Sequence, residues 1–320
     1  MEEGAAPQLI GLDWGTSSLR AFLMREGQVL ETRQAGDGIQ RLAGGDAAAF
    51  ERAFAAISGD WLGRWPRLPV VACGMVGSAQ GWREVPYAKS PADAQAIARQ
   101  ATTLTTASGT HVLIAPGVLH QGAHGAPDVM RGEETQVVGA LQRDVDWSRA
   151  ACLVMPGTHS KWVQVRSGRI EALATHMTGE LFALLRTHSI LGRLIPADAA
   201  PPDDAPPTPG FLRGVDAARQ DRGGLLHTLF SARTLALTQQ LPTAQIADYL
   251  SGLLIGSELV SALTQSPPDV PLVLVGEPAL CRRYGLALAT LQRGAAATLG
   301  NTAPDGLWAL ACAAGLSPSP

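Results

Sequence analysis

The residues with the clearest chemical potential form a short segment near the N-terminus, Asp13-Trp14-Gly15-Thr16-Ser17-Ser18-Leu19-Arg20. The segment follows an apolar run and combines a carboxylate, a glycine that permits close backbone approach, and several hydroxyl and amide donors. Such a surface suits phosphate groups and a Mg²⁺ ion, which prefers oxygen ligands. The same residue types also make ordinary hairpin turns, so this segment alone leaves both interpretations open.

A similar segment, Pro156-Gly157-Thr158-His159-Ser160-Lys161, follows the apolar run CLVM halfway along the chain. Each segment lies between two predicted strands, and a second glycine-containing turn and a third strand follow each of them. A unit that recurs after roughly 140 residues indicates two related halves rather than a short-period repeat. Two such hairpins could hold a triphosphate from both sides. Lys161 could reach the phosphates or lie on the surface.

The elements that must position these turns alternate between strands and helices. In the first half we expect strands at residues 9–12, 19–24, 29–31, 70–73 and 112–115, and helices at 47–61 and from Ala92 onward. In the second half we expect a surface loop at the Pro- and Ala-rich residues 195–210, helices at 224–240, 243–263 and 305–314, and a buried strand at 270–276. This pattern predicts an α/β protein with two domains, residues 1–143 and 144–320.

The amino-acid composition excludes some classes of binding partner. The chain has 320 residues, 46% of them hydrophobic, and a formal net charge of −3, so it can bury a sizeable core but has no broad basic surface for nucleic acid. Its longest apolar stretches contain Ser and Glu, and its first residues are acidic, so neither a membrane span nor a secretory signal is indicated. The four cysteines are widely separated, which favours reduced core residues over a metal site or disulfides. We expect a cytoplasmic protein that acts on small molecules.

The two hairpin segments resemble the phosphate motifs of the actin/hexokinase/Hsp70 superfamily. Within its carbohydrate-kinase branch the first motif is D-x-G-T-x-S-x-R, and this sequence matches it at Asp13, Gly15, Thr16, Ser18 and Arg20. The resemblance implies a duplicated, two-domain actin-like ATPase fold of ribonuclease H-like type, with a nucleotide cleft between the domains. It also implies ATP as substrate and Mg²⁺ as cofactor, the metal held by Asp13 directly or through water. The implied phosphate-binding residues are Gly15, Thr16, Ser17, Arg20, Gly157, Thr158 and His159.

An adenosine-binding turn is expected after the buried strand in the last quarter of the chain. The segment VLVGEPALCRRY offers Gly276 and Ala279 for this role, and it has one glycine where many relatives have two. The alternative is that Gly276 serves only the turn from strand to helix.

A candidate catalytic base lies in the segment RGEETQVVGA, residues 131–140, which resembles the Gly-Asp-Gln-Gln stretch of glycerol and xylulose kinases. Glu133 then occupies the position of the catalytic aspartate, where a carboxylate takes the proton of the attacking hydroxyl. Neighbouring residues of a helix point about 100° apart, so Glu133 and Glu134 cannot both face one site. We expect Glu133 to be the base. The alternative role is a carboxylate that only complements the helix dipole.

The resemblance narrows to the 2-dehydro-3-deoxygalactonokinase family. It rests on the segments IGLDWGTSSLRA, GMVGSAQGWREVPY, PGVLH, VMRGEETQ, VMPGTHSKW, MTGELFALLRTHSILG and YLSGLLIGSE, which together extend over nearly the whole chain. The family phosphorylates the C6 hydroxyl of 2-keto-3-deoxygalactonate with MgATP in galactonate catabolism, so the resemblance implies that reaction here.

A keto-acid substrate needs a cation for its carboxylate and polar groups for its hydroxyls. The residues that we expect to supply them are Gly77, Ser78, Gln80, Arg83, Tyr87 and Arg131. Trp14 and Trp82 could form an apolar wall for the sugar or belong to the core. A kinase for another sugar acid and a sugar-sensing regulator of the same fold remain alternatives. The epimer preference and the oligomeric state, with a homodimer among the options, stay open.

Overall fold

The computed structural model describes residues 6–42, 47–122, 125–196, 206–221 and 223–316. Its internal contacts divide the chain into two compact units. Unit 1 contains Met1–Ala150, Val163–Leu173 and Asn301–Pro320, and unit 2 contains Ala151–Trp162 and Ala174–Gly300. The domain boundary expected between residues 143 and 144 stays a prediction, and each unit is described here by itself.

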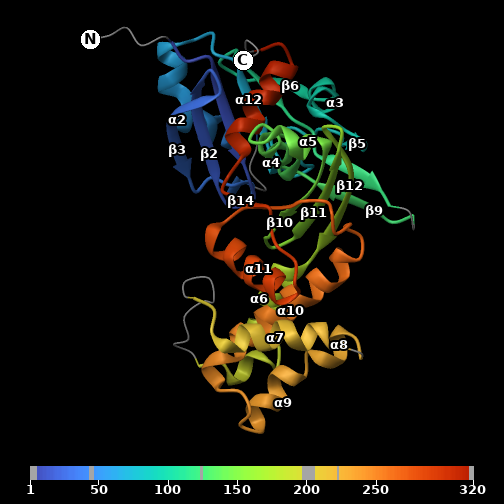
Figure 1. The fold of residues 1–320 in the computed structure, drawn as a ribbon. Helices are drawn as coiled ribbons and strands as arrows, with labels where there is room; N and C mark the ends of the chain where they lie inside the picture. The colour runs from blue at the N-terminus through green and yellow to red at the C-terminus, as the bar shows by residue number, and fades with distance from the viewer. Residues whose placement is uncertain (1–5, 43–46, 123–124, 197–205, 222, 317–320) are drawn as a thin grey trace. The chain divides into compact units, whose positions relative to one another are not determined.

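The main sheet of unit 1 has six strands in the order β3-β2-β1-β4-β7-β6. Two of them, β2 and β3, lie side by side in Figure 1. Their bounds are β1 Leu9–Trp14, β2 Leu19–Arg25, β3 Gln28–Ala35, β4 Val70–Cys73, β6 Thr102–Thr105 and β7 His111–Ile114. β1, β2 and β3 form the antiparallel meander expected from the sequence. β1, β4 and β7 run parallel, so their carboxyl ends meet at one edge of the sheet. Ligands of open α/β sheets bind at this edge.

The remaining elements of unit 1 comprise a small three-stranded sheet and several helices. The strands are β5 Ala88–Lys89, β8 Val118–Gln121 and β9 Pro127–Met130, in the order β5-β8-β9. The helices are α1 Ile39–Leu42, α2 Ala47–Arg64, the short η1 Met75–Gly77, α3 Ala94–Arg99, α4 Glu133–Ala140, α5 Val145–Arg149 and α12 Ala303–Ala313. The small sheet was not expected, because its strands of two to four residues carry little periodic signal. Helices near the positions of α2, α3, α4 and α12 were expected, whereas α1, η1 and α5 were not.

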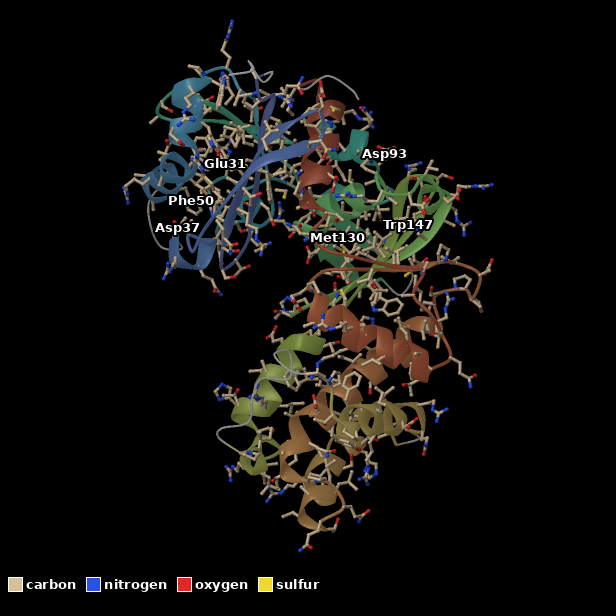
Figure 2. The ribbon with its side chains drawn as sticks, turned by 60° about the vertical axis from the view of Figure 1, so that its left-hand side comes forward. Glu31, Asp37, Phe50, Asp93, Met130 and Trp147 are labelled. Carbon is tan, nitrogen blue, oxygen red and sulfur yellow. The ribbon has the colours of Figure 1, made fainter. Side chains whose placement is uncertain are left out.

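Helix α2 covers the sheet with one apolar stripe. Its buried residues Phe50, Phe54, Ile57 and Trp61 recur at intervals of three and four, which places them on one face of the helix. The indole of Trp14 packs against the ring of Phe50 with centroids 5.7 Å apart, and its N–H donates to the backbone carbonyl of Asp37 at 2.7 Å. Figure 2 labels both partners, Phe50 on α2 and Asp37 in the loop after β3.

Helices α4 and α12 pack with their backbones unusually close. A Cβ added to Gly139 of α4 would lie 2.0 Å from the carbonyl oxygen of Thr302, and one added to Gly306 of α12 would lie 1.8 Å from that of Thr135. The hydroxyl of Thr302 donates to the carbonyl of Gln136 at 2.7 Å. Only glycine fits at such contacts, so the C-terminal helix holds α4 in place.

A five-stranded sheet has the order β12-β11-β10-β13-β14. Its strands are β10 Ala150–Met155, β11 Ser160–Arg166, β12 Arg169–His176, β13 Leu272–Val275 and β14 Ala297–Leu299. Consecutive strands β10, β11 and β12 lie side by side, as in the first meander, and β13 pairs parallel with β10. The repeated unit expected from the sequence is therefore confirmed at the level of strand order.

Most helices of unit 2 surround one apolar helix, α10 Ile246–Leu263. The others are α6 Thr178–His188, η2 Gly192–Leu194, α7 Pro209–Arg219, α8 Leu225–Thr228, α9 Ser231–Leu237, η4 Thr243–Gln245 and α11 Pro278–Thr290 (Figure 1). Among the described residues, one helical stretch, Thr243–Leu263, has the length and hydropathy of a membrane span, and 78% of its most apolar window is buried within the protein. It serves as a core helix.

Two expectations for unit 2 need correction. The helix expected at 224–240 is two helices, because the hydroxyl of Ser231 donates to the carbonyl of Thr228 and competes with the helical hydrogen bonds at that point. The loop expected at 195–210 lies largely at 197–205, outside the described residues, and its last two residues, Pro209 and Gly210, already belong to α7.

Candidate active site

The first hairpin turn, between β1 and β2, is held from behind by the entry to α1. The backbone N–H of Gly15 donates to the carbonyl of Ser18 at 2.9 Å, and the carbonyls of Gly15 and Thr16 accept from Ile39 and Gln40. A Cβ on Gly38 would lie 2.2 Å from the carbonyl carbon of Ser17, so only glycine fits there. The turn is thus fixed while Thr16 and Ser17 stay exposed, as a phosphate-binding turn requires.

Asp13 stands at the carboxyl end of β1, directly before this turn. In the sheet, Asp13 lies opposite Arg20 of β2 and opposite Cys73 of β4. The side chains of Asp13 and Arg20 form an ion pair, with Arg20 Nη1 3.6 Å from Asp13 Oδ2. The Asp13 side chain is 19% exposed. Its burial raises the pKa of Asp13 above 3.8, and the charge of Arg20 acts in the opposite direction.

The segment after β4 brings the start of α4 to the same edge of the sheet. Gly74 and Gly132 both have positive φ angles, 93° and 107°, and a Cβ on Gly132 would lie 3.2 Å from the Cα of Gly74. A Cβ on Gly74 would in turn lie 2.7 Å from the carbonyl oxygen of Trp14. Three chain segments that carry Asp13, Cys73 and Glu133 therefore converge through backbone contact.

Burial separates the two candidate bases. Glu134 is fully buried, and its carboxylate accepts from the N–H of Gly132 at 2.7 Å and from the hydroxyl of Thr135 at 3.0 Å. Its burial, reinforced by the neighbouring charge of Glu133, raises the pKa of Glu134 to about 7. Glu133 is only half-buried, and its Oε2 accepts from the backbone N–H of Arg131 at 3.0 Å. A substrate hydroxyl can reach Glu133 more readily than Glu134.

Arg131, which follows Met130 at the end of β9 (Figure 2), presents donors of the kind that a carboxylate would use. Its Nη2 donates to the carbonyl of Val85 at 2.8 Å, and its guanidinium stacks 4.2 Å from the ring centre of Tyr87. Its Nε and Nη1 are buried without a hydrogen-bond partner, and so is the hydroxyl of Ser78. A Cβ on Gly77 would lie 3.0 Å from Nη1 of Arg131. Arg131, Tyr87, Gly77 and Ser78 thus belong to one neighbourhood.

The other expected substrate residues lie differently. Gln80 and Arg83 are exposed on the loop that follows η1. Trp14 is fully buried and Trp82 is 9% exposed, and their rings pack together with centroids 5.7 Å apart. Both tryptophans therefore belong to the core, as the alternative interpretation held, and neither forms a wall of a sugar site.

In unit 2 the second hairpin turn is backed in the same way as the first. A Cβ on Gly179 would lie 2.5 Å from the carbonyl oxygen of Gly157, and the N–H of Glu180 donates to the carbonyl of Thr158 at 3.0 Å. The imidazole Nε2 of His159 lies 2.5 Å from a carboxylate oxygen of Glu180. Lys161 is buried and donates to the hydroxyl of Thr175, so it is not the surface lysine that we considered.

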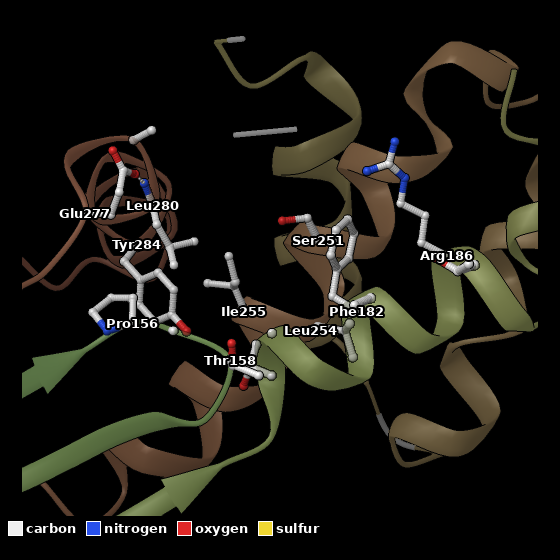
Figure 3. Close-up of a pocket in the computed structure, with 16 residues that line it drawn as sticks. Pro156, Thr158, Phe182, Arg186, Ser251, Leu254, Ile255, Glu277, Leu280 and Tyr284 are labelled. Carbon is white, nitrogen blue, oxygen red and sulfur yellow. Dashed lines mark hydrogen bonds between the residues drawn. The ribbon is translucent and has the colours of Figure 1, made fainter. Parts of the chain in front are cut away.

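A cavity of about 650 Å³ opens beside this turn, entirely within unit 2. Figure 3 shows Pro156 and Tyr284 on one side, Phe182 and Ser251 on the other, and Thr158 and Ile255 between them. Ala279 also lines the cavity. Gly276 has a φ of 151° and lies behind the turn, since its added Cβ would be 3.6 Å from the carbonyl oxygen of Pro156.

The comparisons with known proteins agree along almost the whole chain. The family model described as DGOK, 2-keto-3-deoxy-galactonokinase, matches residues 13–310. The chain belongs to this family. Among its 2-keto-3-deoxy-galactonokinase relatives, the Escherichia coli (strain K12) 2-dehydro-3-deoxygalactonokinase is 38% identical over 296 residues, which cover 92% of this chain and 94% of the relative. A Rhizobium meliloti (strain 1021) protein assigned the same activity is 37% identical and covers 87% of both chains.

Solved structures agree with the assignment to the 2-keto-3-deoxy-galactonokinase family. A Sinorhizobium meliloti crystal structure that carries the 2-dehydro-3-deoxygalactonokinase name has a TM-score of 0.81 and 32% identity, and covers 95% of this chain and 98% of that one. Component A of (R)-2-hydroxyglutaryl-CoA dehydratase from Acidaminococcus fermentans, with a TM-score of 0.51 and 10% identity, shares the fold alone over 97% of this chain and 100% of its own. The expected actin-like ATPase type of α/β fold is confirmed.

For this 2-keto-3-deoxy-galactonokinase family member, sequence reasoning missed Gly38 and considered Gly179 only as part of a helix start beside the nucleotide, not as support for a turn. Gly38 follows the third strand of the first meander and directly precedes α1, and Gly179 follows the third strand of the second and is the second residue of α6. Each meander is followed by a glycine close to the start of a helix. Comparing the two halves as far as this helix would have identified Gly38 and Gly179. Glu258, a buried carboxylate on α10, was also missed, because it stands in an otherwise apolar helix.

Proposed function

We propose that this chain is an ATP-dependent kinase that transfers the γ-phosphoryl group of ATP to the C6 hydroxyl of 2-dehydro-3-deoxy-D-galactonate, in galactonate catabolism. Membership of the 2-keto-3-deoxy-galactonokinase family supports the reaction. One structural observation supports an acid as the substrate: the buried Nε and Nη1 of Arg131 have no hydrogen-bond partner. Arg131 precedes the carboxylate of Glu133 by two residues, so a cation for an acid and a base for a hydroxyl lie near each other.

In this proposal Glu133 accepts the proton of the C6 hydroxyl. The hydroxyl oxygen bonds to the γ-phosphorus while the bond from that phosphorus to the bridging oxygen breaks, and ADP leaves. The Glu133 side chain is oriented for this role by the backbone N–H of Arg131, at 3.0 Å. Arg131 and Ser78 bind the acid end of the sugar, Tyr87 holds the guanidinium by stacking, and Arg83 and Gln80 approach the substrate from the exposed loop.

Asp13 is the residue that we assign to Mg²⁺, directly or through water. One largely buried carboxylate beside exposed hydroxyls fits a Mg²⁺ ion that keeps waters and nucleotide phosphates as its other ligands. Within the described ranges, no group of three or more His, Cys, Asp or Glu side chains forms a dedicated metal cage. When bound with the nucleotide, Mg²⁺ neutralises charge on the phosphoryl oxygens. Burial raises the pKa of Asp13, and the charge of Arg20 partly opposes that rise.

We assign the nucleotide phosphates to both hairpin turns and the adenosine to the cavity of unit 2. The first turn offers Gly15, Thr16 and Ser17 with Arg20 nearby, and the second offers Gly157, Thr158 and His159. The cavity of about 650 Å³ is large enough for a nucleoside. Ala279 lines it directly, and Gly276 supports the turn beside it.

The deciding experiment measures ADP formation with 2-keto-3-deoxygalactonate, with its gluconate epimer and with a panel of other sugar acids. We expect ADP formation that depends on 2-keto-3-deoxygalactonate, and a singly phosphorylated product by mass spectrometry. Phosphorus–proton coupling in the product then places the phosphate on C6. Equal ADP formation without sugar would contradict a kinase, and preference for another acid would overturn the substrate.

Two further expectations belong to the proposal. A cytoplasmic location fits an enzyme whose substrates are ATP and a catabolic sugar acid. Either a monomer or a homodimer is compatible with the proposal, and light scattering of the purified protein decides between them.

A further inference from the structure

Glu258 is a buried carboxylate that the proposed reaction does not use. It lies on α10 with 4% of its surface exposed, and four side chains donate hydrogen bonds to it. Oε1 accepts from the hydroxyl of Ser160 and the indole N–H of Trp162, both at 2.8 Å. Oε2 accepts from the hydroxyl of Thr178 at 2.5 Å and from that of Tyr284 at 2.6 Å. Each oxygen thus has two donors, which offsets the cost of burying the charge.

These donors come from three separate elements around the second hairpin turn. Ser160 and Trp162 lie on β11 directly after the turn, Thr178 is the first residue of α6, and Tyr284 lies on α11. The hydroxyl oxygen of Tyr284 also lies 3.2 Å from that of Ser160. Its burial, together with the charge of Glu258, raises the pKa of Tyr284 well above its ordinary value, so the phenol remains a donor. The carboxylate therefore joins β11, α6 and α11 to α10.

The network reaches the cavity without exposing Glu258 to it. Thr178 and Tyr284 line the cavity, whereas Glu258 does not. Thr178 also precedes Gly179, whose position against the carbonyl of Gly157 leaves no room for a side chain. A shift of Thr178 would consequently move α6 away from the hairpin turn. Figure 3 shows Thr158 and Tyr284 at the end of the cavity where these elements meet.

We propose that Glu258 is a positioning residue for the nucleotide: through Thr178, Ser160 and Tyr284 it sets the geometry of the hairpin turn and the cavity wall against which ATP binds. The inference rests on the proposed function, since it assigns the nucleotide to this cavity. It also gives a role to Thr178 of the segment MTGELFALL and to Glu258 of the segment YLSGLLIGSE.

The test replaces Glu258 by Gln, which keeps the size of the side chain. The amide nitrogen of Gln cannot accept hydrogen bonds, so two of the four donors lose their acceptor whichever way the amide points. We expect the Kd of ADP, measured by calorimetry, and the KM of ATP to rise tenfold or more. The KM of the sugar acid should change less than twofold, because its proposed residues belong to unit 1.

The matched control is Asp248→Asn. Asp248 is a second buried carboxylate of α10; it pairs with Arg283 at 2.7 Å and accepts from the N–H of Thr208. Its loss should lower the Tm while leaving the Kd of ADP within twofold of the wild-type value. If Glu258→Gln lowers the Tm as much as Asp248→Asn does and also leaves the Kd of ADP unchanged, Glu258 has only a structural role and the inference is overturned.

Ser160→Ala provides a milder variant should Glu258→Gln fail to fold. It removes one donor to Glu258 and lies outside the residues that line the cavity. We expect a threefold to fivefold rise in the Kd of ADP, and an unchanged Kd would contradict the inference. Other results would contradict the proposed function. A wild-type protein that binds no ADP contradicts both the proposed function and the role of Glu258. A preference for a different sugar acid contradicts only the proposed substrate.

Discussion

Gly132 lies against Gly74, so close that a Cβ on Gly132 would be 3.2 Å from the Cα of Gly74. Gly74 follows β4 and Gly132 precedes α4, and both have φ angles that side chains disfavour. This contact sets the start of α4 at the carboxyl edge of the sheet, where Asp13 is the second-to-last residue of β1. The distance between the metal-binding candidate and the base candidate therefore depends on two residues without side chains.

Gly74→Ala should both destabilise the protein and reduce turnover. The substitution adds backbone strain of about 1–3 kcal/mol, because residues with side chains rarely adopt the φ of 93° and ψ of −157° of Gly74. The new Cβ would also lie 2.7 Å from the carbonyl oxygen of Trp14. Gly109→Ala is the matched control, since Gly109 has a φ of 86° with open space around its Cβ position. Urea unfolding should show a larger decrease in the free energy of unfolding for Gly74→Ala than for Gly109→Ala. Equal decreases would mean that a small structural shift removes the clash between the new Cβ and Trp14.

Glu133→Gln should reduce kcat by about 10²–10⁴-fold, the range for loss of a general base. The Kd of ADP should stay within twofold, because Gln keeps the shape of the side chain. Glu134→Gln is the control, since Glu134 is fully buried and accepts from the N–H of Gly132. A larger loss of kcat in Glu134→Gln than in Glu133→Gln would reverse the assignment of the base.

Glu134 should make the protein less stable as the pH rises. Its pKa is raised from 4.5 to about 7, so its contribution is fully present below pH 4.5 and is lost as the pH rises through about 7. The glutamine of Glu134→Gln cannot ionise. Between pH 5 and pH 8 the free energy of unfolding of this variant should therefore rise on the order of 2 kcal/mol relative to that of the wild type. Chemical denaturation across this range measures the difference. The exposed Glu84→Gln controls for the lost charge, and parallel curves for all three proteins would refute the prediction.

Arg131→Lys should raise the KM of the sugar acid at least tenfold and leave the KM of ATP within twofold. Lysine keeps the charge but loses the planar, stacked donor set that lies 4.2 Å from the centre of the Tyr87 ring. Arg83→Ala should also raise the KM of the sugar acid, by less, because Arg83 is exposed. Steady-state kinetics with both substrates varied provide the measurement. An unchanged KM of the sugar acid would remove the substituted arginine from the substrate site.

Local patterns in the sequence were sufficient to predict the strands that lead into the candidate site residues. Asp13 and the glycine-threonine turns follow short apolar runs, and such runs are typical of buried strands. The duplicated meander was visible for the same reason, since a strand, a turn and a strand are encoded by neighbouring residues. The choice of Glu133 followed from a motif, and its half-buried position supports that choice.

Contacts between distant segments could not be predicted in this way. Gly38, Gly74 and Gly179 are needed because another piece of backbone lies against each of them. Lys161 follows a turn and was expected at the surface or at the phosphates, yet the hydroxyl of Thr175 provides it with a buried partner. Tertiary packing, rather than local propensity, decides each of these cases.

The packing of α12 on α4 has a consequence for the order of events during synthesis. The helix that begins with Glu133 is held by glycine and threonine contacts from residues 302–306, which are synthesised more than 160 residues later. The strands β1, β2 and β3 can pair early, but α4 lacks these contacts until residues 302–306 have been made. We therefore expect the first hairpin turn to form before the position of Glu133 is fixed.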